Sequence, residues 1–439
     1  MYDYIAQCMI YGAGGKPWAA QEGIKFLCPV PGYDRHFGIL ESMGIKMINI
    51  PMLKDGPDMD KIDELIKDEK VKGIFCVPKY SNPEGKTFSD ETVRRFAAMK
   101  PAAKDFRVIW DNAYIVHDFN DTPDSILNIF DAAKEYGSED LFIEVASTSK
   151  ITFPGAGISV LAASDNNIKA IKKRMSAQII GHDKINQLRH ARYFKNLDGI
   201  KAHMKKHAAI IRPKFETVLN AFDKELSGLG IAEWTKPNGG YFISLCVMPG
   251  TAKEVGRLCK EAGVTLTTVG ATYPYGIDPE DSNIRIAPTF PSEEELAKAV
   301  EILCVCVKLA AVQKKAANKF IELLPSDNVP AWDMVFTNPK ILKDTSAAVI
   351  AACGMLEMNK LDKNHPDCEK WTNKVHDMLR ELWKNHCTNG NIDDTSAILM
   401  HGTGDVRRNS GVNESLIYGD YYYMEALVRL LKPDWIRYW

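Results

Sequence analysis

The chain lacks the long apolar runs and the excess of one charge that mark membrane and nucleic-acid-binding proteins. No stretch of its 439 residues reaches the ~20 consecutive apolar residues that a membrane-spanning helix needs. Lysine and arginine number 55 against 57 acidic residues, so the net charge of −2 gives no general attraction to nucleic acid or anionic lipid. We therefore expect neither a nucleic acid nor a membrane as partner.

Paired cysteines are also missing. The ten cysteines show no paired spacing, and several, among them Cys28, Cys76 and Cys246, lie inside apolar runs. Reduced, buried thiols fit this usage better than a disulfide framework. The first residues, beginning Met1-Tyr2-Asp3, carry an acid and no long apolar run, so we expect no signal peptide and a cytoplasmic location.

Two histidine or cysteine pairs have spacings that suggest metal ligands. Cys304 and Cys306 stand two apart in a helical pattern, where side chains face apart. His203 and His207 stand four apart, but two lysines lie between them and no acid follows. We expect no metal site.

Residues 24 to 163 alternate between short apolar segments and helical patterns, which predicts a mainly parallel sheet covered on both faces. The expected strands are 24–28, 45–50, 72–77, 106–110, 141–146 and 158–163, and the expected helices are 34–43, 59–68, 90–99 and 124–135.

The rest of the chain predicts two further parts. Residues 166–223 suggest two helices, the second one long; strands near 231–235, 240–246 and 283–287 with a helix at 252–262 suggest a smaller α+β part. A helical pattern then runs from 292 to about 324, followed by helices at 344–358, 366–386 and 419–432 without a convincing strand. We expect a large domain over 1–200, a small domain over 201–312 and an all-helical part over 318–439.

Polar side chains follow three of the expected strands. Asn82 follows 72–77, Asp111 and Tyr114 follow 106–110, and Ser147, Ser149 and Lys150 follow 141–146. The carboxyl ends of parallel strands meet at one edge of the sheet, where ligands bind. Any one cluster alone is more often a turn, but their agreement on one edge predicts a single site.

These residue types suit pyridoxal phosphate (PLP). An amine such as that of Lys150 forms a Schiff base with the aldehyde and moves the α-proton. A carboxylate, here Asp111, keeps the pyridine nitrogen protonated. Tyrosine and asparagine can hydrogen-bond the phenolic oxygen, and serine hydroxyls with backbone N–H groups can bind the phosphate. The expected catalytic residues are Lys150, Asp111 and Tyr114.

Five longer motifs carry a family resemblance. The chain resembles a fold-type I PLP transferase, and within it the aspartate aminotransferases of the MocR-like subgroup of class I, over about residues 1–312. The motifs are Pro29-Val30-Pro31-Gly32-Tyr33-Asp34-Arg35-His36-Phe37, Val77-Pro78-Lys79-Tyr80-Ser81-Asn82-Pro83, Trp110-Asp111-Asn112-Ala113-Tyr114, Ser147-Thr148-Ser149-Lys150 and Asn283-Ile284-Arg285-Ile286-Ala287-Pro288.

The resemblance implies further roles and an activity. Tyr33 would stack on the cofactor ring, while Arg285 would clamp the substrate α-carboxylate beside Asn82. The implied reaction is amino transfer between a dicarboxylic, aspartate-like amino acid and a 2-oxo acid, carried out by a homodimer.

The resemblance also implies two departures at the phosphate. Many aminotransferases have an arginine eight positions after the lysine, where this chain has Ile158. The family's N-terminal segment and phosphate loop lie upstream of Met1, and Gly12-Ala13-Gly14-Gly15 reads as a flexible turn that does not replace them. We therefore expect an N-terminally truncated large domain and weak PLP retention.

Residues 320–439 resemble a different family, the unsaturated glucuronyl hydrolases, whose fold is an (α/α)6 barrel. The motifs are Phe320-Ile321-Glu322-Leu323-Leu324-Pro325, Trp332-Asp333, Asp344-Thr345-Ser346-Ala347-Ala348, His401-Gly402-Thr403-Gly404 and Ser415-Leu416-Ile417-Tyr418-Gly419-Asp420-Tyr421-Tyr422. The resemblance covers only the last helices of that barrel and implies that the catalytic aspartates lie in the part not covered.

We therefore assign no hydrolytic role to the aspartates of this segment, Asp333, Asp344 and Asp420, and expect caps or barrel-lining residues. A few hairpins of a barrel would also leave apolar side chains poorly covered, namely Met424, Leu427, Leu430 and Leu431. The alternatives to an aminotransferase are a remnant of a uronide hydrolase and a non-catalytic chimera.

Overall fold

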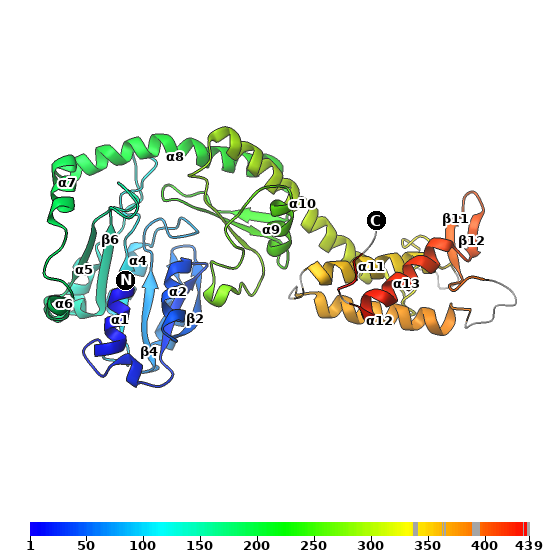
Figure 1. The fold of residues 1–439 in the computed structure, drawn as a ribbon, viewed down its shortest axis with the longest axis horizontal. Coiled ribbons are helices and arrows are strands. Elements are labelled where there is room, and N and C mark those ends of the chain that lie inside the picture. The colour runs from blue at the N-terminus through cyan, green and yellow to red at the C-terminus, as the bar shows by residue number, and fades with distance from the viewer. Residues whose placement is uncertain (337–340, 362, 364–365, 389–395, 433, 437–439) are drawn as a thin grey trace. The chain divides into compact units, whose positions relative to one another are not determined.

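A computed structural model describes residues 1–439 except 337–340, 362, 364–365, 389–395, 433 and 437–439. The chain forms two compact units (Figure 1). Unit 1 comprises Met1–Val247 and Cys259–Cys304, and unit 2 comprises Met248–Leu258 and Val305–Trp439. The division falls within the helices α9 (Ala252–Glu261) and α10 (Glu293–Leu323).

Unit 1 is built on a seven-stranded sheet with the order β3-β2-β1-β4-β5-β6-β7. The strands are β1 (Lys25–Val30), β2 (Lys46–Leu53), β3 (Gly56–Pro57), β4 (Val71–Cys76), β5 (Arg107–Asp111), β6 (Phe142–Ser147) and β7 (Ser159–Ala163). The pairs β1–β2, β1–β4, β4–β5 and β5–β6 are parallel, whereas β3 and β7 add antiparallel strands at the two edges. The expected mainly parallel sheet is confirmed.

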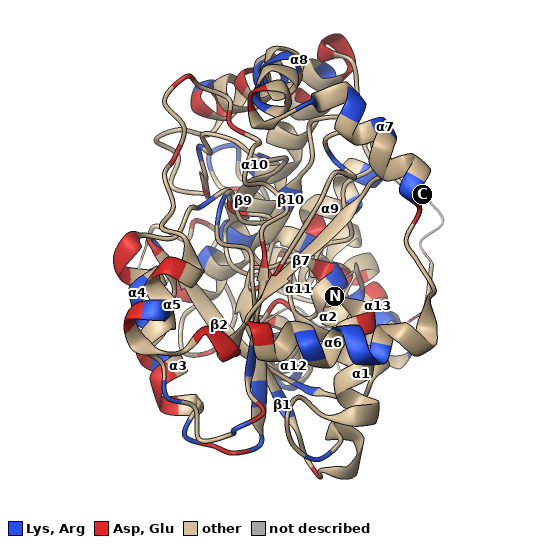
Figure 2. Ribbon diagram, turned by 90° about the vertical axis from the view of Figure 1, so that its left-hand side faces the viewer, with Lys and Arg blue, Asp and Glu red and all other residues tan. Residues whose placement is uncertain are grey.

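Helices precede, connect and follow these strands. They are α1 (Tyr2–Tyr11), η1 (Trp18–Ala20), α2 (Asp34–Ser42), α3 (Met59–Leu65), α4 (Asp90–Ala98), α5 (Ile129–Tyr136), η2 (Glu139–Leu141), α6 (Asp165–Gln178), α7 (Lys184–Phe194) and α8 (Leu197–Glu225). Figure 1 shows α8 as one long helix running along unit 1. Figure 2 shows basic and acidic residues mixed on α4 and α5, as solvent-facing sides of helices require.

The expectation of two helices over 166–223 was wrong, since the structure has three. Asp183 caps the start of α7 by accepting a hydrogen bond from the N–H of Asn186. Asn196 caps α8 in the same way through the N–H of Gly199, directly after Lys195 with a φ of 64°. Asp and Asn at these positions start new helices, and the positive φ of Lys195 ends the preceding one.

Apolar side chains cover both faces of the large sheet. Along β5, Trp110 packs into one core cluster with α3, α4 and α5, while Ile109 packs into a second cluster with α1 and α2. Successive residues of a strand point to opposite faces, so a strand buried on both sides reads as a continuous apolar run. This explains why β4 and β5 were recognisable in the sequence.

A second, antiparallel sheet completes unit 1. Its order is β10-β9-β8, with β8 (Ala232–Trp234), β9 (Ile243–Val247) and β10 (Asn283–Ile286), and η3 (Pro274–Gly276) precedes β10. Cys246 is exposed, which corrects the expectation of a buried thiol. Leu245 and Val247 point to the buried face of β9, so Cys246 between them points away from it.

In the described part of unit 2, three helices pack around a core that includes Trp371 and Met378, and the end of α10 packs against the same core. The helices are α11 (Thr345–Leu361), α12 (Cys368–Asn385) and α13 (Ile417–Leu431). A hairpin of β11 (Gly402–Asp405) and β12 (Ser410–Glu414) was not expected, because these glycine-rich and polar segments lack the apolar alternation of a strand.

The expectation of poorly covered apolar residues on α13 is confirmed for Met424 and Leu431 and is wrong for Leu427 and Leu430. Met424 and Leu431 are 46% and 81% exposed, whereas Leu427 and Leu430 pack against the core of unit 2. None of the helices in the described part of the chain is both long and apolar enough to cross a bilayer.

Candidate active site

The polar clusters predicted from the sequence lie at neighbouring strand ends. β4, β5 and β6 are adjacent and parallel in the sheet. Asp111 is the last residue of β5 and Ser147 is the last residue of β6. Asn82 lies in the loop that follows β4. The topology therefore delivers all three clusters to the same edge of the sheet.

The turn that carries Lys150 is held by Thr148. The N–H of Thr148 donates to the carbonyl of Ile158 at 2.8 Å, and the N–H of Ile158 donates to Oγ1 of Thr148 at 2.8 Å. The same hydroxyl lies 3.0 Å from Nε2 of His190 on α7. The carbonyl of Lys150 itself accepts a hydrogen bond from the hydroxyl of Tyr241 at 3.0 Å. These contacts fix the backbone from which the lysine side chain projects.

The amine of Lys150 lies over two tyrosine rings. Its Nζ is 4.5 Å from the ring centroid of Tyr114 and 5.7 Å from that of Tyr33. Burial lowers the pKa of Lys150 below its ordinary value, while the negative charge of Asp111 acts in the opposite direction. Burial also raises the pKa of Tyr114, with Asp111 adding to the effect. The lysine is thus shifted toward its neutral, nucleophilic form and the tyrosine stays protonated.

Asp111 has a partner that the sequence reading did not assign a role. Nε2 of His36, on α2, lies 3.0 Å from Oδ2 of Asp111, and both side chains are buried. The His36 ring stacks on Phe75 at 4.3 Å between centroids and contacts the edge of Tyr33 at 5.1 Å. The only signal for His36 was its place in the motif that begins at Pro29. His36 fixes the carboxylate and leaves its other oxygen for a ligand.

Arg285 of β10 reaches the loop after β4. Its Nη1 donates to Oδ1 of Asn82 at 3.3 Å and to Oδ1 of Asp34 at 2.8 Å, and its guanidinium lies 5.2 Å from the ring of Phe242. Nδ2 of Asn82 and Nε of Arg285 are buried and have no hydrogen-bond partner among the described residues. Unpaired buried donors of this kind are costly, so a ligand that accepts from them would stabilise the site.

His117 is a second residue that sequence reasoning missed. Its ring lies 5.5 Å from that of Tyr114 and 5.3 Å from that of Tyr241. Neither ring nitrogen has a hydrogen-bond partner in the described part of the chain, and burial lowers the pKa of His117 to about 3. His117 is therefore a buried, neutral residue beside Tyr114 and Tyr241. No sequence pattern around His117 indicated that its side chain is buried.

Ser147 lies beside a large cavity of about 810 Å³, whose lining also includes Asp111, Gly157 and Ile158. The N–H of Ser149 points at Oγ of Ser147 at 3.5 Å. A side chain on Gly157 would come within 2.8 Å of the Ser149 nitrogen, so glycine keeps this nitrogen accessible. Ile158 directly precedes β7 and brings no charge to the cavity.

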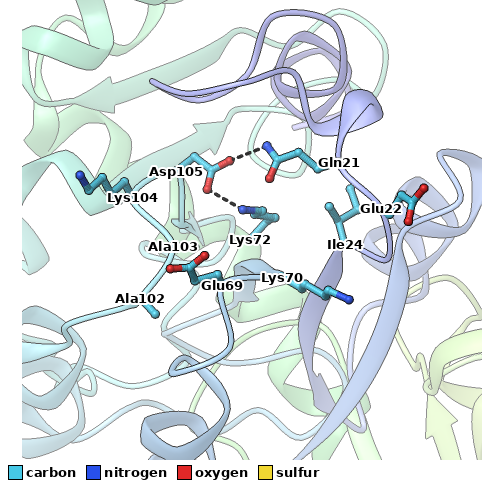
Figure 3. Close-up of a pocket in the computed structure, with 10 residues that line it drawn as sticks. All are labelled: Gln21, Glu22, Ile24, Glu69, Lys70, Lys72, Ala102, Ala103, Lys104 and Asp105. Atoms are coloured by element: carbon cyan, nitrogen blue, oxygen red, sulfur yellow. Dashed lines mark hydrogen bonds and ion pairs between the residues drawn. The ribbon is translucent and has the colours of Figure 1, made fainter.

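A second cavity, of about 330 Å³, lies at the opposite, amino ends of β1, β4 and β5. Figure 3 shows Asp105 joined by dashed lines to Gln21 and Lys72, whose side-chain nitrogens donate to the carboxylate at 3.1 and 2.8 Å. Trp18 donates to the same carboxylate at 3.0 Å. Because these partners satisfy the charge of Asp105, this cluster ties three segments together and offers little to a ligand.

The aspartates of unit 2 bind backbone N–H groups. Oδ1 of Asp344 accepts from the N–H groups of Ser346 and Thr403 at 3.1 and 3.3 Å. Asp420 accepts from Leu399 at 2.7 Å, and Asp333 accepts from Val335 at 3.0 Å. These are the contacts of turn and cap residues. Among the residues that the structure describes, no group of three His, Cys, Asp or Glu side chains is placed to hold a metal ion.

Comparison with known proteins gives two separate matches. Residues 320–439 were expected to resemble unsaturated glucuronyl hydrolases, and the unsaturated glucuronyl hydrolase of Bacillus sp. (strain GL1) is 31% identical over 124 residues. That match covers 28% of this chain and 33% of the relative. The C-terminal resemblance is confirmed, and the chain spans only a third of that relative's length.

The larger match covers the part that carries the site. The family model for aspartate amino-transferase matches residues 1–319. The aspartate aminotransferase of Corynebacterium glutamicum is 47% identical over 318 residues, which is 72% of this chain and 74% of the relative. A crystal structure of an aspartate transaminase from that organism superimposes with a TM-score of 0.71 at 47% identity, over 72% of this chain and 74% of the other. These matches confirm the expected fold and enzyme class, and the chain belongs to the aspartate aminotransferase family.

Proposed function

We propose that this aminotransferase uses PLP to move an amino group between a dicarboxylic, aspartate-like amino acid and a 2-oxo acid. The observation that carries the proposal is the position of Lys150. Its amine lies over the rings of Tyr33 and Tyr114, and burial lowers its pKa. An amine shifted toward the neutral form suits covalent capture of an aldehyde and removal of a proton from carbon.

The residues around the lysine fit PLP. Asp111 offers a buried carboxylate to the pyridine nitrogen, and Tyr33 offers a ring face. Asn82 has a buried, unpartnered Nδ2 that can donate to the phenolic oxygen. Tyr114, whose pKa burial raises, keeps its proton for the same oxygen. Ser147, Ser149 and the backbone exposed beside Gly157 would meet the phosphate.

When bound, PLP supplies an electron sink for the bond that breaks at the substrate Cα. Lys150 would take the proton from Cα with Nζ and return it to the accepting carbon. Asp111, positioned by His36, would keep a negative charge beside the ring nitrogen. Arg285 would bind the substrate α-carboxylate in a two-bond arrangement, with Asn82 at its side.

The proposal extends to organisation and location. We propose that residues 1–200 and 201–312 act as the large and small domains, and that residues 318–439 add a helical fragment without hydrolytic activity.

Exposed apolar side chains on and near α7, such as Ile180, Ile185 and Tyr193, support a homodimer that covers them. Buried thiols such as Cys28 and Cys76 support a cytoplasmic location.

The test is formation of oxaloacetate from aspartate and 2-oxoglutarate in the presence of added PLP. Lys150→Ala should lower kcat by at least about a thousandfold, because it removes both the covalent attachment and the proton carrier. Lys134→Ala is the matched control, since Lys134 lies exposed on α5 beside Asp131 and should be dispensable for the proton transfer. An unchanged rate in Lys150→Ala would refute the proposal. Equal rates with aspartate and leucine as donors would refute the substrate class.

A further inference from the structure

We propose that Asp34 is a built-in competitor for Arg285 and thereby sets how tightly the site binds a carboxylate substrate. The inference rests on the proposed role of Arg285 as the carboxylate-binding side chain. Oδ1 of Asp34 lies 2.8 Å from Nη1 of Arg285, across a separation of 251 residues in the sequence. A carboxylate of the protein thus occupies the guanidinium that a substrate carboxylate would need.

Arg285 and Asp34 differ in their exposure to solvent. The side chain of Arg285 is 9% exposed, whereas that of Asp34 is 44% exposed. A buried guanidinium without a counter-charge carries a large desolvation cost, and the amide oxygen of Asn82 at 3.3 Å is only a dipole. Asp34 supplies the missing negative charge while the site is empty. The exchange of Asp34 for a substrate then replaces one carboxylate by another.

Asp34 makes fewer hydrogen bonds to Arg285 than a substrate carboxylate could make. Asp34 meets the guanidinium through one oxygen on Nη1, and the same Nη1 is shared with Asn82. Nε of Arg285 is buried and has no partner in the described residues. A free carboxylate can bind a guanidinium with two parallel hydrogen bonds, which gives it the advantage over a single bond. The geometry therefore favours displacement of Asp34 from Arg285 by the substrate carboxylate.

Displaced Asp34 has another favourable position. It is the first residue of α2, and Tyr33 at the N-cap position provides no side-chain hydrogen bond to the helix. The free N–H groups and the positive end of the helix dipole stabilise a carboxylate in this first turn. Because Asp34 is also close to water, release from Arg285 leaves its charge solvated. Substrate affinity is then the difference between two carboxylates competing for Arg285.

The experiment measures binding of succinate, a dicarboxylate without an amino group, to the PLP-loaded protein by calorimetry. Asp34→Asn and Asp34→Ala should each lower the Kd of succinate about tenfold, which corresponds to about 1.4 kcal/mol. Glu41→Gln is the matched control, because it removes the same charge from the other end of α2 and should leave the Kd unchanged. Raising the ionic strength should make the succinate Kd values of the wild type and the Asp34 variants more similar, because salt weakens the ion pair between Asp34 and Arg285.

Three outcomes would overturn the inference: an unchanged Kd in both Asp34 variants, a higher Kd, or an equal decrease in Glu41→Gln. A higher Kd would mean that Asp34 positions Arg285 for the substrate. Arg285→Lys separates this inference from the proposed function, because it should weaken succinate strongly while PLP remains bound. If Arg285→Lys binds succinate as wild type does, the assignment of Arg285 fails, whatever the Asp34 variants show.

Discussion

At the scale of single residues, the site depends on buried groups whose charges are set by a few neighbours. Lys150 has a pKa lowered by burial, Tyr114 has a pKa raised by burial, and Asp111 is held by His36. In the proposed mechanism, these separate environments prepare a proton acceptor, a proton donor and a fixed negative charge within one cluster. Such a division of roles is typical of acid–base sites.

Asp111 should control the rate of proton removal and not the presence of the cofactor. Asp111→Asn keeps the shape but removes the charge beside the ring nitrogen, so the single-turnover rate with aspartate should fall about 10²–10³-fold. His36→Phe should give a smaller decrease, because it frees the carboxylate without removing it. Stopped-flow absorbance measures both rates, with Asn112→Ala as control, since Asn112 instead bonds Glu144. An unchanged rate in Asp111→Asn would contradict this role.

His117 should make the fold sensitive to acid. Burial lowers its pKa from 6.5 to about 3, so between these values the unfolded chain binds one proton that the folded chain does not. The contribution to stability is fully present above pH 6.5 and is lost as the pH falls, by about 1.4 kcal/mol per pH unit.

Substitution of the ring tests this dependence. When the pH is lowered from about 7 to about 5, the free energy of unfolding should decrease by about 2 kcal/mol less in His117→Phe than in the wild type, as measured by urea denaturation. Because phenylalanine also changes packing, the informative quantity is the difference between the two pH values. His182→Phe, at an exposed position, is the control. The account is wrong if wild type and His117→Phe lose the same stability.

At the scale of elements, the turn after β6 and the segment before β7 act as one unit. Thr148 bonds Ile158 through backbone and side chain, and Gly157 lies against Ser149. Gly157→Ala would place a methyl group 2.8 Å from the Ser149 nitrogen and 3.0 Å from its hydroxyl. The turn must then shift away from the proposed phosphate position.

Gly157→Ala should therefore raise the Kd of PLP about tenfold, which corresponds to the loss of about one charge-assisted hydrogen bond. Fluorescence titration with PLP measures the change. The same substitution at Gly38 is the control, since nothing lies within 4 Å of the added methyl group and alanine favours the helix α2. Equal PLP affinity in Gly157→Ala and wild type would show that this turn does not bind the phosphate.

Sequence patterns predicted the elements whose residues interact locally. β4 and β5 were recognisable because strands buried on both faces are continuously apolar, and the cluster around Lys150 because parallel strands end at one edge. The hairpin of β11 and β12 lacked such a pattern and was missed. The break between α7 and α8 was missed because it depends on the cap at Asn196, within a stretch of helix-forming residues.

At the scale of the whole molecule, the contacts that no local pattern predicts are those made by tertiary packing. His36 meets Asp111 across 75 residues and Asp34 meets Arg285 across 251. The sequence shows that Asp34 and His36 belong to one motif. Only the packing of α2 beside β5 and β10 determines that their partners are Arg285 and Asp111. All of the proposed site residues lie within unit 1, so the helical unit 2 contributes none of them.

The central claim is that Lys150 is the residue that holds PLP. The most direct test incubates the protein with PLP, reduces it with borohydride and maps the pyridoxyl-lysine by peptide mass spectrometry. The account predicts one pyridoxyl group per chain on Lys150, and none in Lys150→Ala. A stoichiometric adduct on another lysine, such as Lys172 in the neighbouring cavity, or the absence of any adduct in the wild-type protein, would contradict it.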